Sequence, residues 1–356
     1  MKIRVLSARD VHELLPYGEC AEVMRTALTA LVRGEVHQPL RTVLRPPGAA
    51  GLMALMPAYA QAPAAVPAEA AVPAPALAQA ETAVQAEADT AGGAYGLKAI
   101  CITPGNPARG KDAHQGGVLV FSGETGEPLA LVNASAVTEI RTAATSAVAT
   151  ALLARPDAAE LAVIGTGVQA RAHLLAIPAV HPVIRARVAG RDPGRARSLA
   201  DEMTGRLGIT VTACETPEQA VAGAGVVVTA TSSARPVLRR EWLASGTHVN
   251  AVGACVPDAR EIDTATMAGA ALFADRRESV LSESGDYILA AREGAVGPDD
   301  IRAELGEILA GAALGRTTPR EITLFESLGL AAEDLAAALY VFRKAAARGA
   351  GTLAEF

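Results

Sequence analysis

The sequence is poor in aromatic residues and in cysteine. Only 3% of its 356 residues are Phe, Trp or Tyr, although half are hydrophobic, so a core must be packed mainly with Ala, Val, Leu and Ile. The four cysteines have no spacing typical of a metal site or of a disulfide framework. We therefore expect free thiols and no bound metal. The cysteines are Cys20, Cys101, Cys214 and Cys255.

The sequence also lacks a block of basic residues and a long apolar run. The net charge of −6 argues against nucleic acid or an anionic membrane surface as the main partner. No run of 18 uncharged apolar residues occurs, and the start of the chain continues into Arg9, Asp10 and Glu13 rather than into a signal-peptide core. We expect a cytoplasmic protein whose partner is a small molecule.

A turn of the dinucleotide-binding type lies near the middle of the chain. The apolar run 161–164 is long enough for a buried parallel strand, and it leads into Gly-x-Gly-x-x-Ala and then a helical segment. The first glycine permits the tight turn, the second lets the backbone approach a pyrophosphate, and the alanine lets the helix pack closely on the sheet. The cofactor-binding residues expected here are Gly165, Thr166, Gly167, Val168, Gln169 and Ala170.

Strands and helices alternate on both sides of this turn. The pattern predicts an α/β fold with a Rossmann-type, doubly wound parallel sheet of about six strands. Residues 141–154 and 330–347 are predicted to be helices, and so are residues 301–310. Strand ends carry further candidate cofactor-binding residues, namely Thr229, Asn250 and Val252.

The end of the second strand of such a sheet selects the cofactor. An acidic residue there binds the free ribose hydroxyl of NAD, whereas an arginine can pair with the 2′-phosphate of NADP. This chain has Gly190-Arg191-Asp192 at that point. We therefore predict that NADP(H) is favoured over NAD(H), with Arg191 as the phosphate ligand. The alternative is that Arg191 is solvated and Asp192 only caps the next helix.

The remaining segments suggest a second, discontinuous α+β domain. We expect a substrate-binding and dimerisation domain over residues 1–140, a dinucleotide-binding domain over 141–322, and a C-terminal segment, 323–356, that returns to the first domain. Residues 61–93 are rich in Ala and Pro and are predicted to be a surface insertion without a catalytic role.

Several motifs together resemble the ornithine cyclodeaminase/mu-crystallin family over nearly the whole chain apart from this insertion. The resemblance implies the two-domain fold, a nicotinamide cofactor and a homodimer. The matching segments are 41–43, 56–59, 96–98, 138–144, the Gly-rich turn, 249–253, 283–286 and 322–329.

The resemblance also implies a substrate site made of cations. Arg41, Lys98 and Arg141 correspond to the residues that hold the substrate carboxylate, with Lys98 and Arg141 as the catalytic candidates. A small amino or imino acid needs such a charge-assisted clamp, and arginine supplies a planar fork that orients the reacting carbon. Lys98 lies within an apolar run and Arg141 begins an apolar helix, so neither has the pattern of a surface charge. Lys98 could also exchange a proton with the substrate nitrogen.

One position separates the activities known in this family. By this resemblance, the cyclodeaminases and the alanine dehydrogenases of the family carry a catalytic aspartate where this chain has Cys255, and a neutral thiol cannot replace that carboxylate. The run 253–261 and the pair His114-Gln115 are instead similar to the mu-crystallin branch. We therefore expect NADPH-dependent reduction of a cyclic ketimine or a related amino-acid dehydrogenase reaction. An ornithine cyclodeaminase and a non-catalytic protein that binds NADPH and a small ligand are the alternatives.

Overall fold

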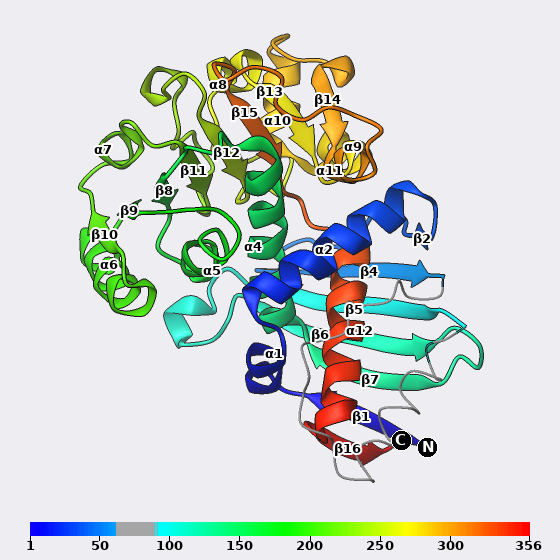
Figure 1. Ribbon diagram of the computed structural model, residues 1–356. Helices are drawn as coiled ribbons and strands as arrows, with labels where there is room; N and C mark the ends of the chain where they lie inside the picture. The colour runs from blue at the N-terminus through cyan, green and yellow to red at the C-terminus, as the bar shows by residue number, and fades with distance from the viewer. Residues whose placement is uncertain (62–89, 91) are drawn as a thin grey trace. The chain divides into compact units, whose positions relative to one another are not determined.

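The computed structural model describes residues 1–61, 90 and 92–356, and it divides them into two compact units (Figure 1). Met1–Arg141 and Leu330–Phe356 form the first domain, and Thr142–Gly329 form the second. Nearly all of the insertion predicted over residues 61–93 lies outside the described residues.

The first domain is built on a mixed sheet with the strand order β16-β1-β7-β6-β5-β4-β2, and β3 pairs with β4. Strand β1 is parallel to β7, and the other neighbours are antiparallel. This agrees with the mixed sheet expected outside the dinucleotide-binding domain. The strands are β1 (Lys2–Leu6), β2 (Val36–His37), β3 (Thr42–Leu44), β4 (Leu52–Ala60), β5 (Ala94–Ile102), β6 (His114–Ser122), β7 (Pro128–Asn133) and β16 (Thr352–Glu355).

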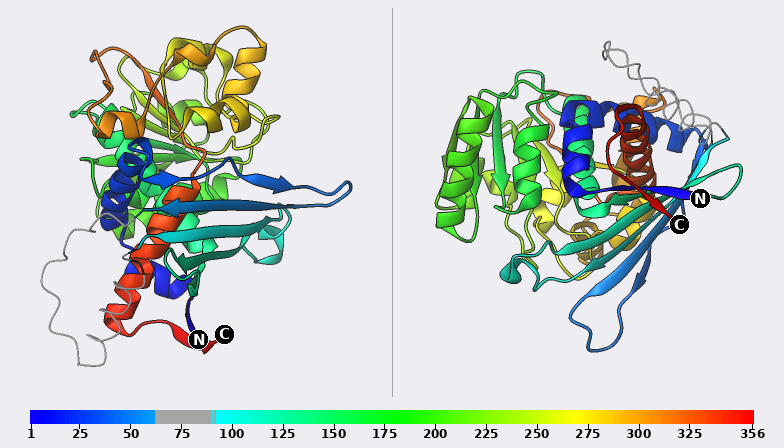
Figure 2. Two further views of the ribbon diagram at one scale, coloured as in Figure 1. Left: turned by 90° about the vertical axis from the view of Figure 1, so that its right-hand side faces the viewer. Right: turned by 90° about the horizontal axis from the view of Figure 1, so that it is seen from below.

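One long helix, α12 (Ala331–Arg348), lies across β4, β5 and β6 and packs against α2 (Figures 1 and 2). A side chain at Gly96 would meet Leu335 of α12 at 2.7 Å, so the glycine allows the helix to lie close to β5. The other helical segments are α1 (Ala8–Leu14), α2 (Tyr17–Val32) and η1 (Pro107–Arg109). Helix α4 (Ala134–Leu153) begins in the first domain and ends in the second.

The second domain contains a parallel sheet with the order β10-β9-β8-β11-β12-β15-β13-β14. The first six strands have the Rossmann arrangement, in which the order reverses between β8 and β11. The predicted fold class is thus confirmed. The strands are β8 (Glu160–Ile164), β9 (Arg185–Ala189), β10 (Thr210–Ala213), β11 (Val226–Thr229), β12 (His248–Ala251), β13 (Ala271–Ala274), β14 (Ile301–Glu304) and β15 (Thr323–Glu326).

Several helices of the second domain begin with side-chain caps. Asp192 accepts hydrogen bonds from the amides of Gly194 and Arg195 at the start of α6, and Thr216 and Gln219 form a capping box at α7. The helical segments are α5 (Val168–Ala176), α6 (Pro193–Leu207), α7 (Pro217–Val221), η2 (Arg240–Trp242), α8 (Thr264–Gly269), α9 (Arg277–Glu283), α10 (Gly285–Arg292), η3 (Pro298–Asp300) and α11 (Leu305–Leu309).

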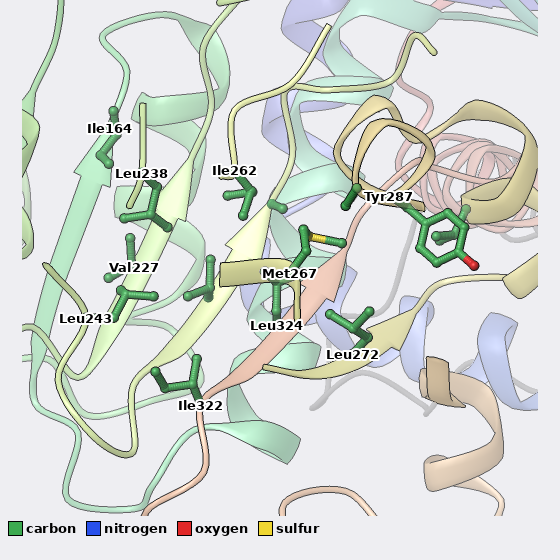
Figure 3. Packing of buried hydrophobic residues seen from close by; sticks show 14 of the residues in the cluster. Ile164, Val227, Leu238, Leu243, Ile262, Met267, Leu272, Tyr287, Ile322 and Leu324 are labelled. Carbon is green, nitrogen blue, oxygen red and sulfur yellow. The ribbon is translucent and has the colours of Figure 1, made fainter. Parts of the chain in front are cut away.

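Aliphatic side chains fill the core of the second domain, as the shortage of aromatic residues predicts. Figure 3 shows Val227, Leu324 and Leu272 on three strands of this sheet, with Ile262 and Met267 packed against them. These residues are 0–1% exposed. Such a core excludes water from the sheet and holds the strand ends in fixed positions.

Two predictions about the second domain were wrong. Residues 301–310 are not one helix, because Ile301–Glu304 form β14 and only Leu305–Leu309 are helical. The C-terminal segment does not leave the second domain at residue 323 either, since Thr323–Glu326 form β15 between β12 and β13. The boundary therefore lies after Gly329.

Among the described residues, no helix combines the length and the apolar character that crossing a membrane requires.

Candidate functional site

Two of the predicted substrate-binding cations lie in the interior of the first domain. Lys98 is in β5, on the face that α12 covers, and its side chain is 2% exposed. Arg141 is in α4 and is 4% exposed. Buried cations of this kind require partners, because an isolated charge in an apolar interior is strongly disfavoured.

The partners come from the first turn of α12. The Nζ atom of Lys98 donates to both carboxylate oxygens of Asp334, at 3.0 and 3.1 Å. Arg141 donates from Nε to Asp334 at 3.0 Å and from Nη1 to Glu333 at 2.9 Å. Glu333 and Asp334 are 0–1% exposed, so two cations and two carboxylates form one buried cluster.

The cluster changes the acidity of its members. Burial lowers the pKa of Lys98 to about 8, although Asp334 opposes the shift and Arg141 adds to it. Burial alone would raise the pKa of Asp334, but Arg141 and Lys98 together bring it below its usual value. Lys98 is therefore protonated at neutral pH and can release its proton slightly above it.

Arg41 and His114 lie near this cluster. Arg41 is half-buried just before β3, and its charge contributes to the lowered pKa of Lys98. Burial, Lys98 and Arg141 lower the pKa of His114, which begins β6. The structure thus brings all three predicted substrate-binding cations into one region of the first domain.

Glu333 and Asp334 were not identified as site residues from the sequence. Glu333 does act as a cap, since the Leu330 amide donates to it at 3.3 Å, but it also binds Arg141. Two acidic residues in the first turn of a helix gave no separate signal, because the helix dipole already explains them.

The Gly-rich turn in the second domain has the conformation that the motif predicts. Gly165 has φ +134°, and a side chain there would meet the Ala230 carbonyl oxygen at 2.3 Å. A side chain at Gly167 would meet nothing within 4 Å, and no side chain caps α5, which starts at the next residue. The first amides of α5 have no intrahelical partner, so these residues fit a pyrophosphate.

The end of β9 explains why no acidic residue stands at position 190. A side chain at Gly190 would meet the Thr166 methyl group at 2.6 Å. The Asp192 carboxylate is already bonded to the first turn of α6, at 2.8 Å to the Gly194 amide. Arg191 is exposed between them.

The other three candidate cofactor-binding residues lie at the carboxyl ends of β11 and β12. Thr229 is the last residue of β11, and Val252 directly follows β12. Both are buried. Asn250 is fully buried, with its amide nitrogen 2.9 Å from the Thr150 hydroxyl and its oxygen 3.3 Å from His248. Both polar atoms of Asn250 are engaged inside the domain, so its cofactor contact stays a prediction that this geometry does not support.

Cys255 is half-buried in the segment after β12. Its sulfur donates to the Val252 carbonyl oxygen at 3.4 Å and lies 3.9 Å from that of Ser327. Behind this segment are Glu261 and Asp286, both almost fully buried. Burial raises the pKa of Asp286 to about 8.

Comparisons with known proteins identify the family. The model of the ornithine cyclodeaminase/mu-crystallin family matches residues 82–349. A Δ1-pyrroline-2-carboxylate reductase of Bacillus cereus is 38% identical over 264 residues, which cover 74% of this chain and 81% of that protein. The ketimine reductase mu-crystallin of Mus musculus is 35% identical over 309 residues, which cover 87% and 85%.

A solved structure is similar over both domains. The Thermococcus litoralis Δ1-pyrroline-2-carboxylate reductase, in complex with NADH and L-proline, gives a TM-score of 0.87 at 34% identity. The match covers 98% of this chain and 99% of that one.

Proposed function

Because the chain belongs to the ornithine cyclodeaminase/mu-crystallin family, we propose that it is an oxidoreductase that reduces a small cyclic imino acid with a nicotinamide cofactor. The observation that carries this proposal is the buried cluster of Lys98, Arg141, Glu333 and Asp334. Relatives named as reductases of pyrroline-2-carboxylate and of ketimines support the reaction class.

We propose that Arg41, Lys98 and Arg141 hold the substrate carboxylate. Asp334 and Glu333 fix the two buried cations, so Lys98 and Arg141 are oriented before substrate binds. Preorganised donors of this kind keep the imino carbon in a reactive position and lower the entropic cost of the reaction.

The reduction adds a hydride to the imino carbon and a proton to the nitrogen. The reduced nicotinamide supplies the hydride when it is bound. For the proton we propose Lys98, whose pKa of about 8 allows its Nζ to carry a proton at neutral pH and to release it readily. In this proposal Lys98 and Arg141 both orient the substrate, and Lys98 also donates one proton to its nitrogen.

We propose that the second domain binds the dinucleotide. Its pyrophosphate would meet the open backbone at Gly167 and the uncapped start of α5 at Val168 and Gln169. The small side chain of Ala170 and the close approach at Gly165 support the same placement, with Thr166 between the two glycines.

We further propose that NADP(H) is favoured over NAD(H). A side chain at Gly190 would meet the Thr166 methyl group, and Asp192 is engaged by α6. Arg191 is exposed and has a guanidinium that can bind a 2′-phosphate at two points.

The Arg191→Ala variant should lose this preference. We expect its Kd for NADPH to rise about 10–100-fold, because a charge-assisted contact with the phosphate is lost, while its Kd for NADH stays unchanged. Titration of both cofactors by fluorescence measures the two constants. Arg206→Ala, near the other end of α6, is the matched control. If Arg191→Ala and the wild-type protein discriminate equally between NADPH and NADH, Arg191 is not the phosphate ligand.

A spectrophotometric screen tests the proposed reaction itself. Consumption of NADPH and NADH is followed with pyrroline- and piperideine-carboxylates, then with keto acids and amines. Turnover of a cyclic imine supports the reductase. Formation of proline and ammonia from ornithine would instead support a cyclodeaminase, which Cys255 disfavours. Tight binding without turnover across the whole panel would identify a binding protein.

We also propose a homodimer that forms through the face of the first sheet opposite α12. This face carries exposed apolar side chains, including Tyr95 (51% exposed), Met53 (39%) and Leu131 (37%). Exposed apolar surface of this kind is typical of a protein–protein contact. Leu131→Glu should halve the mass measured by light scattering, whereas Leu281→Glu in the second domain should not. A monomeric wild-type protein would rule the dimer out.

A further inference from the structure

We infer that Glu261 is a positioning residue for the nicotinamide half of the cofactor, acting through the loops that follow β11 and β12. This inference rests on the proposed binding of a dinucleotide to the second domain. Glu261 belongs to the segment between β12 and α8 and is 0% exposed. It therefore acts on the ligand only through the backbone that it holds.

The carboxylate of Glu261 joins the two loops directly. Its Oε1 accepts a hydrogen bond from the Thr231 amide at 2.6 Å, two residues after β11. Its Oε2 accepts one from the Gly253 amide at 2.7 Å, two residues after β12. One buried side chain thus fixes the first residues beyond two adjacent parallel strands.

The backbone around these bonds is tightly packed as far as the Gly-rich turn. A side chain at Gly253 would meet the Thr231 carbonyl oxygen at 2.3 Å and Glu261 Oε2 at 2.4 Å. Next to this, a side chain at Gly165 would meet the Ala230 carbonyl oxygen at 2.3 Å. The turn after β8 and the loops after β11 and β12 are therefore in successive backbone contact, so a shift of one loop displaces its neighbours.

Glu261 is itself held from several sides. Its carbonyl oxygen accepts bonds from the amides of Val237 and Leu238. Asp286 Oδ1 accepts the amides of Glu261 and Ile262 at 2.7 and 2.8 Å. Ile262 points into the apolar core beside Leu238 and Met267 (Figure 3). A residue anchored this firmly can impose its geometry on the loops, rather than follow them.

The topology decides which part of the cofactor these loops receive. In this strand order the pyrophosphate lies at the turn after β8, and the adenosine ribose lies toward the end of β9. The nicotinamide half must then extend to the other side of the switch point, over the ends of β11 and β12. Those are the two strand ends that Glu261 joins.

A carboxylate suits this position because both backbone groups that it binds are amide donors. Burial raises the pKa of Glu261, and the bonds from Thr231 and Gly253 oppose the rise. A glutamine has the same shape, but one of its two polar atoms is a donor and would face an amide N–H. One of the two loops would then lose its hydrogen bond to residue 261.

The experiment compares binding of the whole cofactor with binding of its adenine half. Calorimetry on the full-length protein measures Kd for NADPH and NADH, and for 2′-phospho-ADP-ribose and ADP-ribose, which lack nicotinamide. In Glu261→Gln we expect Kd for the preferred dinucleotide to rise about tenfold or more, since a hydrogen bond to a charged group is lost. Kd for the matching fragment should change less than twofold. A merely structural role would change the Kd values of both the dinucleotide and the fragment, or of neither.

Asp263→Ala provides the matched control. Asp263 lies two residues further on and accepts amide bonds from Thr266 and Arg240, away from the two loops. This variant should keep the wild-type ratio of the two affinities. If Glu261→Gln does not fold, Glu261→Asp keeps the charge with a shorter reach and should show the same selective loss.

The possible failures can be told apart. A wild-type protein that binds no dinucleotide overturns the proposed function and this inference together. A wild-type protein that binds NADPH or NADH, with Glu261→Gln losing dinucleotide and fragment equally, or neither, overturns only the inference.

Discussion

Arg141→Lys should lower kcat/KM for a cyclic imino acid by about two to three orders of magnitude. Arg141 contacts Asp334 and Glu333 from two different nitrogens, and we propose that its guanidinium also contacts the substrate carboxylate. A lysine keeps the charge but lacks the planar fork, so it cannot hold both carboxylates and orient the substrate. Steady-state kinetics with the best imine from the screen measures the loss.

Two controls give this result its meaning. The affinity for the nicotinamide cofactor should stay within about twofold of the wild-type value, since we assign cofactor binding to the second domain. Arg4 is an equally buried arginine of the first domain, and it donates to the Ala350 carbonyl oxygen at 2.5 Å. The control variant Arg4→Lys should keep a kcat/KM near the wild-type value. Near-normal turnover by Arg141→Lys would show that the cluster is not the substrate site.

Asp334→Asn should lower the free energy of unfolding more than any other substitution proposed for this protein. Lys98 would then lose its ion pair, and Arg141 would keep its ion pair with Glu333 in the same buried cluster. Breaking a buried ion pair from one side costs about 3–5 kcal/mol in the free energy of unfolding. Urea unfolding followed by circular dichroism measures this loss. Asparagine has the same size as aspartate, so no cavity is made and the loss reports the missing charge.

An ion pair of the same domain whose carboxylate is 38% exposed is the comparison. Glu19 accepts a hydrogen bond from Lys344 at 2.6 Å, and Glu19→Gln should cost no more than about 1 kcal/mol. The pH dependence gives a second check. The folded-state pKa of Asp334 lies below its usual value of 3.8, so its stabilisation is present above that pH and is lost as the pH falls below it. The difference between the wild-type protein and Asp334→Asn should therefore shrink below about pH 4.

The sequence revealed those features of the fold that depend on local patterns. The buried strand and the glycines at 161–170 were sufficient to predict the Rossmann turn, because backbone sterics restrict those positions to few residue types. Strand β14 escaped prediction because Ile301–Glu304 run directly into α11 without a turn residue between them. Strand β15 was assigned to the wrong domain, since its partners β12 and β13 are chosen by tertiary packing.

The site was only half predictable for the same reason. Lys98 and Arg141 drew attention as single charges within apolar segments, and a charge in that setting must have a function or a partner. Their partners, Glu333 and Asp334, are separated from Arg141 by the whole second domain. Two acidic residues in the first turn of a helix are already explained by the helix dipole, so nothing local indicated their second role.

The late position of α12 has a consequence for biosynthesis. The second domain is one continuous segment and can fold as soon as Gly329 has left the ribosome. The first domain cannot, because it needs its last 27 residues for α12, for β16 and for the acids that neutralise Lys98 and Arg141. A chain that is truncated after Gly329 and released from the ribosome should therefore carry a protease-resistant second domain and a first domain that is still digested.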